Sequence, residues 1–141
     1  MAERKFNIEF DGYWREKNKG SVPSRSGVYC VYECTYNADT DKVSIHKLIY
    51  IGEAGDVNKR IADHEKWDEW KEYVRSGNEL CFSFAYVESS DRDRVEAALI
   101  FKHKPPANDE YKDSFPFDKT TISSSGKTVF LNTYFTVERT P

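Results

Sequence analysis

Six polar side chains along the chain have the chemistry needed to hydrolyse a phosphodiester bond. They are Tyr29, Tyr50, Arg60, His64, Glu96 and Asn108. Phosphoryl transfer needs positive charge beside the non-bridging phosphate oxygens, and the planar guanidinium of Arg60 would supply it. A hard divalent cation prefers oxygen ligands and keeps several waters, so Glu96 with substrate oxygens could hold Mg²⁺ or Mn²⁺.

The two tyrosines could position or activate the attacking water. A phenol has a pKa near 10 and is therefore a poor base at neutral pH. Tyr29 could act as a base only if a nearby cation lowered its pKa, or if a bound metal acidified the water first. We expect Arg60 or the metal to supply that charge.

Both tyrosines lie on strands that should form a hairpin. Residues 28–36 and 43–51 are rich in β-branched and aromatic side chains, and turn-forming residues separate them. If the loop is centred between Asp39 and Thr40, the numbers of paired residues sum to 79. Tyr29 then lies directly opposite Tyr50, and a slip of one residue would break this pairing.

Two helices should carry the other candidates. Asp56 can cap a helix that runs to about Ser76 and stops at Gly77, with Arg60 and His64 one turn apart on it. Its apolar stripe consists of Val57, Ile61, His64, Trp67, Trp70 and Val74.

Ser90 can cap the second helix, which carries Glu96 and ends before Pro105-Pro106, with Asn108 just beyond. Further strands are expected at residues 6–10, 80–87 and 127–138, a turn at Asp11-Gly12, and a surface loop at 111–125. This order predicts one α/β domain of the α+β type over residues 1–141. Its small central antiparallel sheet is flanked by helices, with extra N- and C-terminal strands.

The composition indicates a folded domain outside the membrane. No apolar run approaches the length of a membrane span, and the N-terminus shows no apolar signal segment. Cys30, Cys34 and Cys81 have no zinc-site spacing and should be small core residues in a reducing, cytoplasmic setting. The net charge of −3 counts mildly against nucleic-acid binding unless a local basic cluster compensates.

The candidate basic clusters are Lys59-Arg60 and Lys102-His103-Lys104, either of which could also be an ordinary solvated helix face. Ordinary roles exist for the site candidates too. The tyrosines suit strands in general, His64 could be a packed histidine, and Asn108 could be a turn residue. For Trp67 and Trp70, core packing is a better interpretation than stacking on DNA.

The ordered motifs resemble the GIY-YIG nuclease superfamily. They are Gly27-Val28-Tyr29, Tyr50-Ile51-Gly52, Arg60 to His64, Glu96, and Asn108 after two prolines, within residues 26–108. The stretch from Glu96 to Asn108 is most similar to the nuclease module of the bacterial excision-repair excinuclease. The resemblance implies a small domain that cuts DNA with one Mg²⁺ or Mn²⁺.

The resemblance also implies a role for each residue. Tyr29 would position or deprotonate the water, and Tyr50 would hydrogen-bond the nucleophile or the phosphate. Arg60 would hold the phosphate, and His64 would assist proton transfer or orient the water. Glu96 would ligate the metal, while Asn108 would brace the site.

Some residues depart from the family pattern. Val28 replaces the usual isoleucine, and Glu53 places an acid beside the expected phosphate site. No second DNA-binding domain is visible, so selectivity for particular DNA sequences would come from added loops, a homo-oligomer or a protein partner. The alternatives are a catalytically weak or inactive nucleic-acid-binding module on the same fold and a protein-interaction domain. The latter would leave the six polar residues unexplained.

Overall fold

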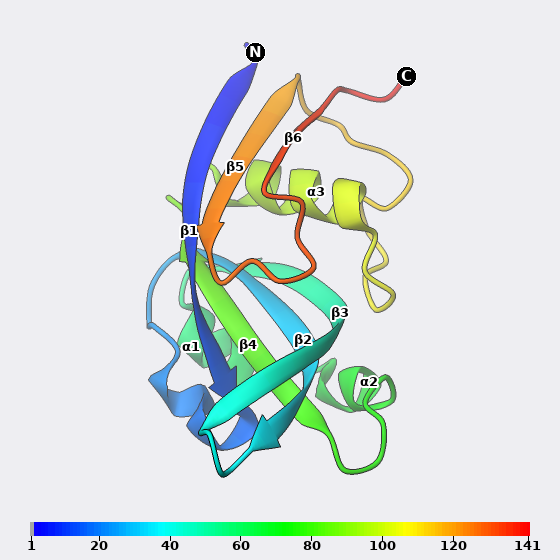
Figure 1. Cartoon of the computed structure of the whole chain (residues 1–141). Helices are drawn as coiled ribbons and strands as arrows, with labels where there is room; N and C mark the ends of the chain where they lie inside the picture. The colour runs from blue at the N-terminus through cyan, green and yellow to red at the C-terminus, as the bar shows by residue number, and fades with distance from the viewer. Residues whose placement is uncertain (1) are drawn as a thin grey trace.

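The computed structural model describes residues 2–141 and contains one six-stranded mixed sheet (Figure 1). The strands are β1 (Arg4–Arg15), β2 (Gly27–Asn37), β3 (Lys42–Ala54), β4 (Glu79–Tyr86), β5 (Thr120–Gly126) and β6 (Tyr134–Val137). The helices are η1 (Glu16–Ser21), α1 (Val57–Ala62), α2 (Trp67–Lys71) and α3 (Arg92–His103). The sheet order is β3-β2-β4-β1-β5-β6, with only β1 and β5 parallel. The α+β class with a central antiparallel unit is confirmed.

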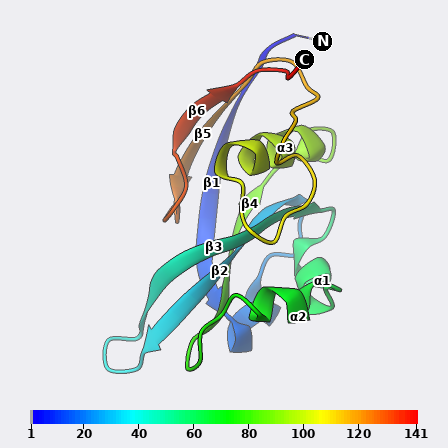
Figure 2. The same ribbon diagram turned by 90° about the vertical axis from the view of Figure 1, so that its right-hand side faces the viewer.

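The helices cover opposite faces of the central strands. Successive residues of a strand point to opposite faces, and β2 is buried on both. Val28 and Cys30 pack into the core that contains α3, whereas Tyr29 and Val31 pack into the core that contains α1 and Trp70. Figure 2 shows α3 beside β1, β5 and β6, with α1 and α2 at the other end of the molecule. The buried cysteines and Trp70 confirm the predicted core positions.

Two β-bulges set the hairpin register. Near the turn, Asn37 pairs with Lys42, as the sequence predicts. Register shifts between Val31 and Tyr32 and between Glu33 and Cys34 then move the pairing by two residues. The prediction that Tyr29 lies opposite Tyr50 is therefore wrong, because a bulge leaves no signal in strand periodicity.

The shift leaves the two phenols on the same face. Tyr29 pairs with Gly52 and Val31 pairs with Tyr50. A shift of two residues, unlike a shift of one, preserves the face to which a side chain points. Tyr29 and Tyr50 are therefore diagonal neighbours, with ring centroids 6.3 Å apart.

The expected helix from Asp56 to Ser76 is broken. Asp56 does cap α1, since its carboxylate accepts the Lys59 N–H. Helical geometry is lost at Asp63, and a second helix begins only at Trp67. The break turns the ring of His64 inward, where its Nδ1 accepts the Lys66 N–H. Arg60 and His64 thus do not share one continuous helix face.

Three other expectations differ from the structure. Asp11-Gly12 does not turn the chain, because β1 continues along β4 through a bulge between Gly12 and Trp14. Ser90 does not cap α3, which begins after Asp91 without a side-chain cap. The expected loop over 111–125 contains most of β5, a serine- and threonine-rich strand held by backbone pairing with β1 and β6.

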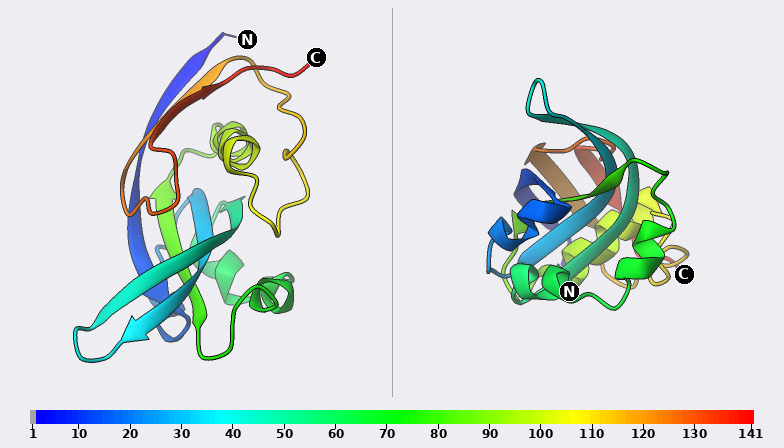
Figure 3. Two further views of the ribbon diagram at one scale, coloured as in Figure 1. Left: turned by 45° about the vertical axis from the view of Figure 1, so that its right-hand side comes forward. Right: turned by 90° about the horizontal axis from the view of Figure 1, so that it is seen from below.

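The C-terminal strand is also shorter than expected. Of residues 127–138, only Tyr134–Val137 form a strand, β6. The chain between α3 and β5 makes a long excursion beside α3, and the tip of the β2–β3 hairpin projects away from the domain (Figure 3). Within residues 2–141, no helix has the length and apolar character to cross a membrane.

Gly52 provides a direct test of this packing. A Cβ at Gly52 would overlap the Tyr29 ring, which is 1% exposed and bonded to His64 and so has little room to move. We expect Gly52→Ala to lower the free energy of unfolding by about 1–3 kcal/mol in urea titrations. Gly20→Ala is the control, since nothing lies within 4 Å of the added carbon. Equal stability of the two variants would contradict the packing described.

Candidate active site

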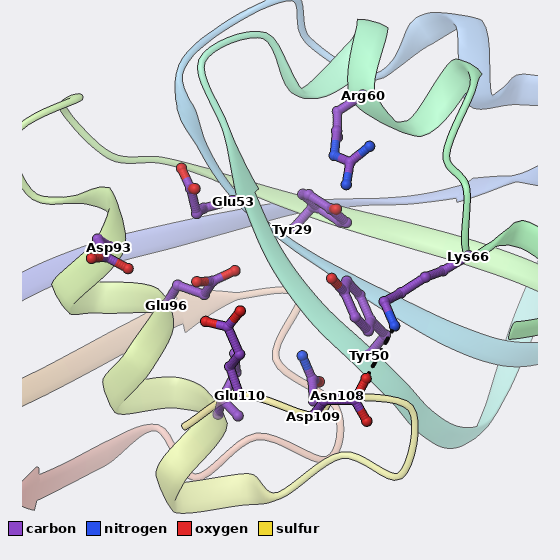
Figure 4. A pocket seen from close by; sticks show the side chains of 11 residues that line it. Tyr29, Tyr50, Glu53, Arg60, Lys66, Asp93, Glu96, Asn108, Asp109 and Glu110 are labelled. Atoms are coloured by element: carbon purple, nitrogen blue, oxygen red, sulfur yellow. Dashed lines mark hydrogen bonds and ion pairs between the residues drawn. The ribbon is translucent and has the colours of Figure 1, made fainter. Parts of the chain in front are cut away.

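A pocket of about 340 Å³ lies beside the end of β3, where the segments after β3 and α3 meet (Figure 4). Its polar lining comprises Tyr29, Tyr50, Glu53, Arg60, Lys66, Asp93, Glu96, Asn108, Asp109 and Glu110. Five of the six predicted residues line it, and the sixth, His64, lies beneath Tyr29. The structure thus brings all six together, while their catalytic roles stay predictions.

The two phenols are largely withdrawn from solvent. Burial raises the pKa of Tyr29 well above its ordinary value, Tyr50 raises it further, and Arg60 lowers it by less. Burial raises the pKa of Tyr50 to about 12, with Glu96 adding to the shift. Without a further cation, both tyrosines are therefore neutral at pH 7.

The hydrogen bonds of His64 define its tautomer. A backbone N–H can only donate, so Nδ1 accepts from Lys66 and carries no proton. Burial, followed by the charge of Arg60, lowers the pKa of His64 to about 4, so the ring is neutral at pH 7. The ring proton is therefore on Nε2, which donates to Tyr29 Oη at 3.0 Å. The hydroxyl proton of Tyr29 must point elsewhere, and His64 holds Tyr29 without being able to take its proton.

Arg60 reaches the pocket from the last turn of α1, but both terminal nitrogens of its guanidinium already donate hydrogen bonds to another residue. Its Nη1 and Nη2 donate to the two carboxylate oxygens of Glu65 at 2.5 and 2.8 Å. The Arg60 side chain is 36% exposed and that of Glu65 65% exposed, so this ion pair lies at the solvent boundary. A phosphate that binds at the terminal nitrogens of Arg60 must displace Glu65.

Glu96 projects from α3 among other carboxylates. Burial raises its pKa to about 8, and the negative charges of Glu53, Asp93 and Glu110 add to the shift. The carboxylates of Glu96 and Glu110 point toward one another in Figure 4. Within residues 2–141, no group of three or more His, Cys, Asp or Glu side chains is arranged to hold a metal. A cation bound here would therefore have to take most of its ligands from water or substrate.

Asn108 braces the edge of the sheet. Its side-chain amide donates to Ile51 O and accepts from Ile51 N, both at 2.9 Å. Ala107 N donates to Ile49 O, two residues before Ile51 on the same strand. The segment after α3 thus satisfies backbone groups of the edge strand β3 that would otherwise be unpaired. This position suits a bracing role and explains why the residue is buried.

The sequence interpretation missed several residues of the pocket. Lys66 lies in the break between α1 and α2, and its Nζ contacts Asp109 at 3.3 Å. Asp93, one helical turn before Glu96, and Glu110, two residues after Asn108, were detectable by spacing. Lys66 could not be detected in this way, because its place at the pocket depends on the break between α1 and α2, and the sequence predicts a continuous helix there.

The acid at Glu53 has a partner. Arg92 Nε donates to Glu53 at 2.7 Å, and its Nη1 donates to Ser26 Oγ at 3.0 Å. The unfavourable charge expected beside the phosphate site is thus partly compensated. This compensation comes from α3, which the sequence does not show to lie next to β3.

The Lys102-His103-Lys104 cluster is not a continuous basic surface. His103 Nδ1 bonds the Leu99 carbonyl, and its Nε2 accepts the Asn132 N–H, so this ring joins α3 to the segment before β6. Burial lowers the pKa of His103. Lys104 donates to the Lys112 carbonyl. Lys102 and Lys104 are both exposed, and the bond of Lys104 to a neutral carbonyl leaves its charge in place.

The chain is similar to UvrABC system protein C. Over 105 residues it is 31% identical to the protein of that name from Rickettsia bellii (strain RML369-C) and 32% identical to that from Rickettsia canadensis (strain McKiel). The alignments cover 72% of this chain but only 15% of the relatives' length. No protein-family model matches the chain, and no solved structure matches it. The partial similarity supports the suspected relationship to GIY-YIG nucleases.

The raised pKa of Glu96 predicts a pH-dependent stability change. Below about pH 4.5 this carboxyl is protonated in both the folded and the unfolded chain, whereas between 4.5 and 8 only the folded chain holds the proton. Its burial therefore destabilises the fold progressively as pH rises through this window. We expect Glu96→Gln to stabilise the protein by about 1–3 kcal/mol at pH 8 and to leave it unchanged at pH 4.5.

Urea unfolding at the two pH values measures this difference. Glu88→Gln, which removes an exposed carboxylate outside the pocket, should change neither value. A Glu96→Gln variant that is less stable than the natural protein at pH 8 would contradict the electrostatic description of the pocket.

Proposed function

We propose that this protein is a metal-dependent DNA endonuclease that hydrolyses phosphodiester bonds in the pocket beside β3. The observation that carries the proposal is the convergence of Tyr29, Tyr50, Arg60 and Glu96, from four separate elements, on one solvent-accessible pocket. The similarity to UvrABC system protein C over 105 residues supports it.

The chemistry of the pocket fits a hard divalent cation. Glu96 offers carboxylate oxygen, and Glu110 faces it from the segment after α3. Burial, and then neighbouring negative charge, makes ionised Glu96 unfavourable in the pocket, and a cation would stabilise the ionised form. A bound Mg²⁺ or Mn²⁺ would withdraw negative charge from the scissile phosphate.

The residues at the other side of the pocket would handle the phosphate and the water. Arg60, released from Glu65, offers two parallel N–H donors to phosphate oxygens, and Lys66 adds a second positive charge. The hydrogen bond from His64 holds Tyr29 Oη in place, so a free lone pair or the phenol proton can orient a water.

In the reaction, the water oxygen bonds to phosphorus, one P–O ester bond breaks, the water loses a proton, and the departing oxygen takes up a proton from solvent. Tyr29 can accept the proton of the water only after it has released its own phenol proton to solvent, which the donated His64 hydrogen bond and nearby positive charge would favour. Tyr50, on the same face, would contact the phosphate or the water. Asn108 holds the segment after α3 against β3, the strand that carries Tyr50.

The alternative, a nucleic-acid-binding module without catalysis, would depend on basic surface away from Glu96. Both ring nitrogens of His103 are bonded within the fold and burial lowers its pKa, so Lys102 and Lys104 are the charges that the cluster offers. Lys102 is exposed and lies outside the pocket, so its replacement helps to separate the two proposals.

Plasmid cleavage tests the catalytic proposal. With Mg²⁺ or Mn²⁺ present, we expect Arg60→Ala and Glu96→Gln each to reduce the rate of nicking by about 10²–10³-fold, because each removes charge stabilisation from the transition state. Lys102→Ala should cut at close to the natural rate. Undiminished cleavage by the first two variants, or loss of cleavage only in Lys102→Ala, would count against the proposed site.

Metal binding can be measured without any activity. A ligand that binds only the folded protein stabilises it, by about 2.7 kcal/mol at a concentration one hundred times its Kd. We therefore expect Mg²⁺ to raise the thermal midpoint of the natural protein and of Glu88→Gln, but not that of Glu96→Gln. A full Mg²⁺-induced rise in Glu96→Gln would exclude Glu96 as the ligand.

A further inference from the structure

Glu65 occupies the position that a phosphate would take on Arg60. The carboxylate accepts from both terminal nitrogens of the guanidinium, at 2.5 and 2.8 Å. This is the paired geometry by which arginine binds carboxylates and phosphates alike. Because the same two donors cannot serve both anions, Glu65 and a phosphate oxygen pair compete for the fork.

The surrounding segment holds Glu65 in place for this contact. Glu65 lies in the break between α1 and α2, and the residues on either side of it are anchored in the pocket. His64 donates to Tyr29 at 3.0 Å, and Lys66 contacts Asp109 at 3.3 Å across the pocket mouth. Figure 4 shows this Lys66–Asp109 link as a dashed line. Both cations that line the pocket are thus already paired with carboxylates.

The exposure of the pair decides how strongly it competes. Exposed ion pairs typically contribute about 0.2–1 kcal/mol to stability, and a bidentate arginine–carboxylate geometry is the case in which such a pair does contribute. With Glu65 65% exposed, the contact can open readily when a better anion arrives. It should therefore weaken phosphate binding by a small factor instead of abolishing it.

We propose that Glu65 is an intramolecular competitor that closes the phosphate-binding fork of Arg60 and lowers the affinity of the pocket for phosphodiester anions. This inference rests on the proposed function in one respect, the assignment of Arg60 as the phosphate contact. The competitor lies on the same short segment as His64, so its release requires movement of the Glu65 side chain and no rearrangement of the bond to Tyr29.

A double-mutant cycle on binding tests the competition. The Kd of a short labelled DNA duplex, with Ca²⁺ replacing Mg²⁺ to suppress hydrolysis, is measured for the natural protein, Glu65→Gln, Arg60→Ala and the double variant. We expect Glu65→Gln to bind about three- to fivefold more tightly than the natural protein, the range for an exposed ion pair. This gain should disappear in the Arg60→Ala background.

Glu72→Gln is the matched control, since it removes the same charge from an exposed glutamate just beyond α2 and outside the pocket. It should leave the Kd unchanged. The proposal is overturned if Glu65→Gln binds no more tightly, if its gain persists without Arg60, or if Glu72→Gln gives the same gain. Absence of duplex binding by every variant would also overturn it.

Steady-state cleavage separates this proposal from the proposed function. A lower KM with unchanged kcat in Glu65→Gln supports competition, whereas a lower kcat means that Glu65 positions Arg60 and overturns it. If the natural protein never cleaves DNA but the binding cycle gives the expected pattern, the competition stands and the endonuclease proposal falls.

Discussion

The buried hydrogen bond between His64 and Tyr29 is the interaction on which the pocket depends. To make it, the chain abandons helical geometry at Asp63, and the Lys66 N–H is satisfied by the imidazole instead of by a carbonyl one turn earlier. That break brings Glu65 to Arg60 and Lys66 to the pocket mouth. The two hydrogen bonds of His64 thus define its tautomer and hold the phenol of Tyr29, and the break places Lys66 at the pocket.

A second set of contacts holds the acidic side of the pocket against this basic side. Asn108 and Ala107 bind the backbone of the edge strand β3, so the segment after α3 cannot separate from the sheet. Glu96 and Arg60 therefore line the same pocket from different elements. Burial of Glu96, together with repulsion from the neighbouring carboxylates, makes the ionised form of Glu96 unfavourable, and a bound cation would relieve this cost. Ionised Glu96 therefore lowers the free energy of unfolding of the protein.

Much of the fold and the membership of the site could be predicted from sequence. Residue type and periodicity indicated β2, β3, β4 and α3, and the six polar residues do converge. The failures have physical causes. The bulges in the β2–β3 pair and the inward turn of His64 depend on tertiary contacts that periodicity does not record. Strand β5 was missed because, apart from Ile122, it has no large apolar side chain and is defined by its neighbours.

We have proposed that Glu96 binds a divalent cation at a site that hydrolyses phosphodiester bonds. The most direct test is a crystal structure with a DNA duplex, in which anomalous diffraction locates Mn²⁺. A second, high-resolution structure with Mg²⁺ gives the distances from the ion to its ligands. We expect an ion in the pocket beside β3, with an oxygen of Glu96 at about 2.1 Å from Mg²⁺ and a phosphate oxygen also bound to the ion. An ion bound elsewhere, or DNA bound with the pocket beside β3 empty, would contradict it.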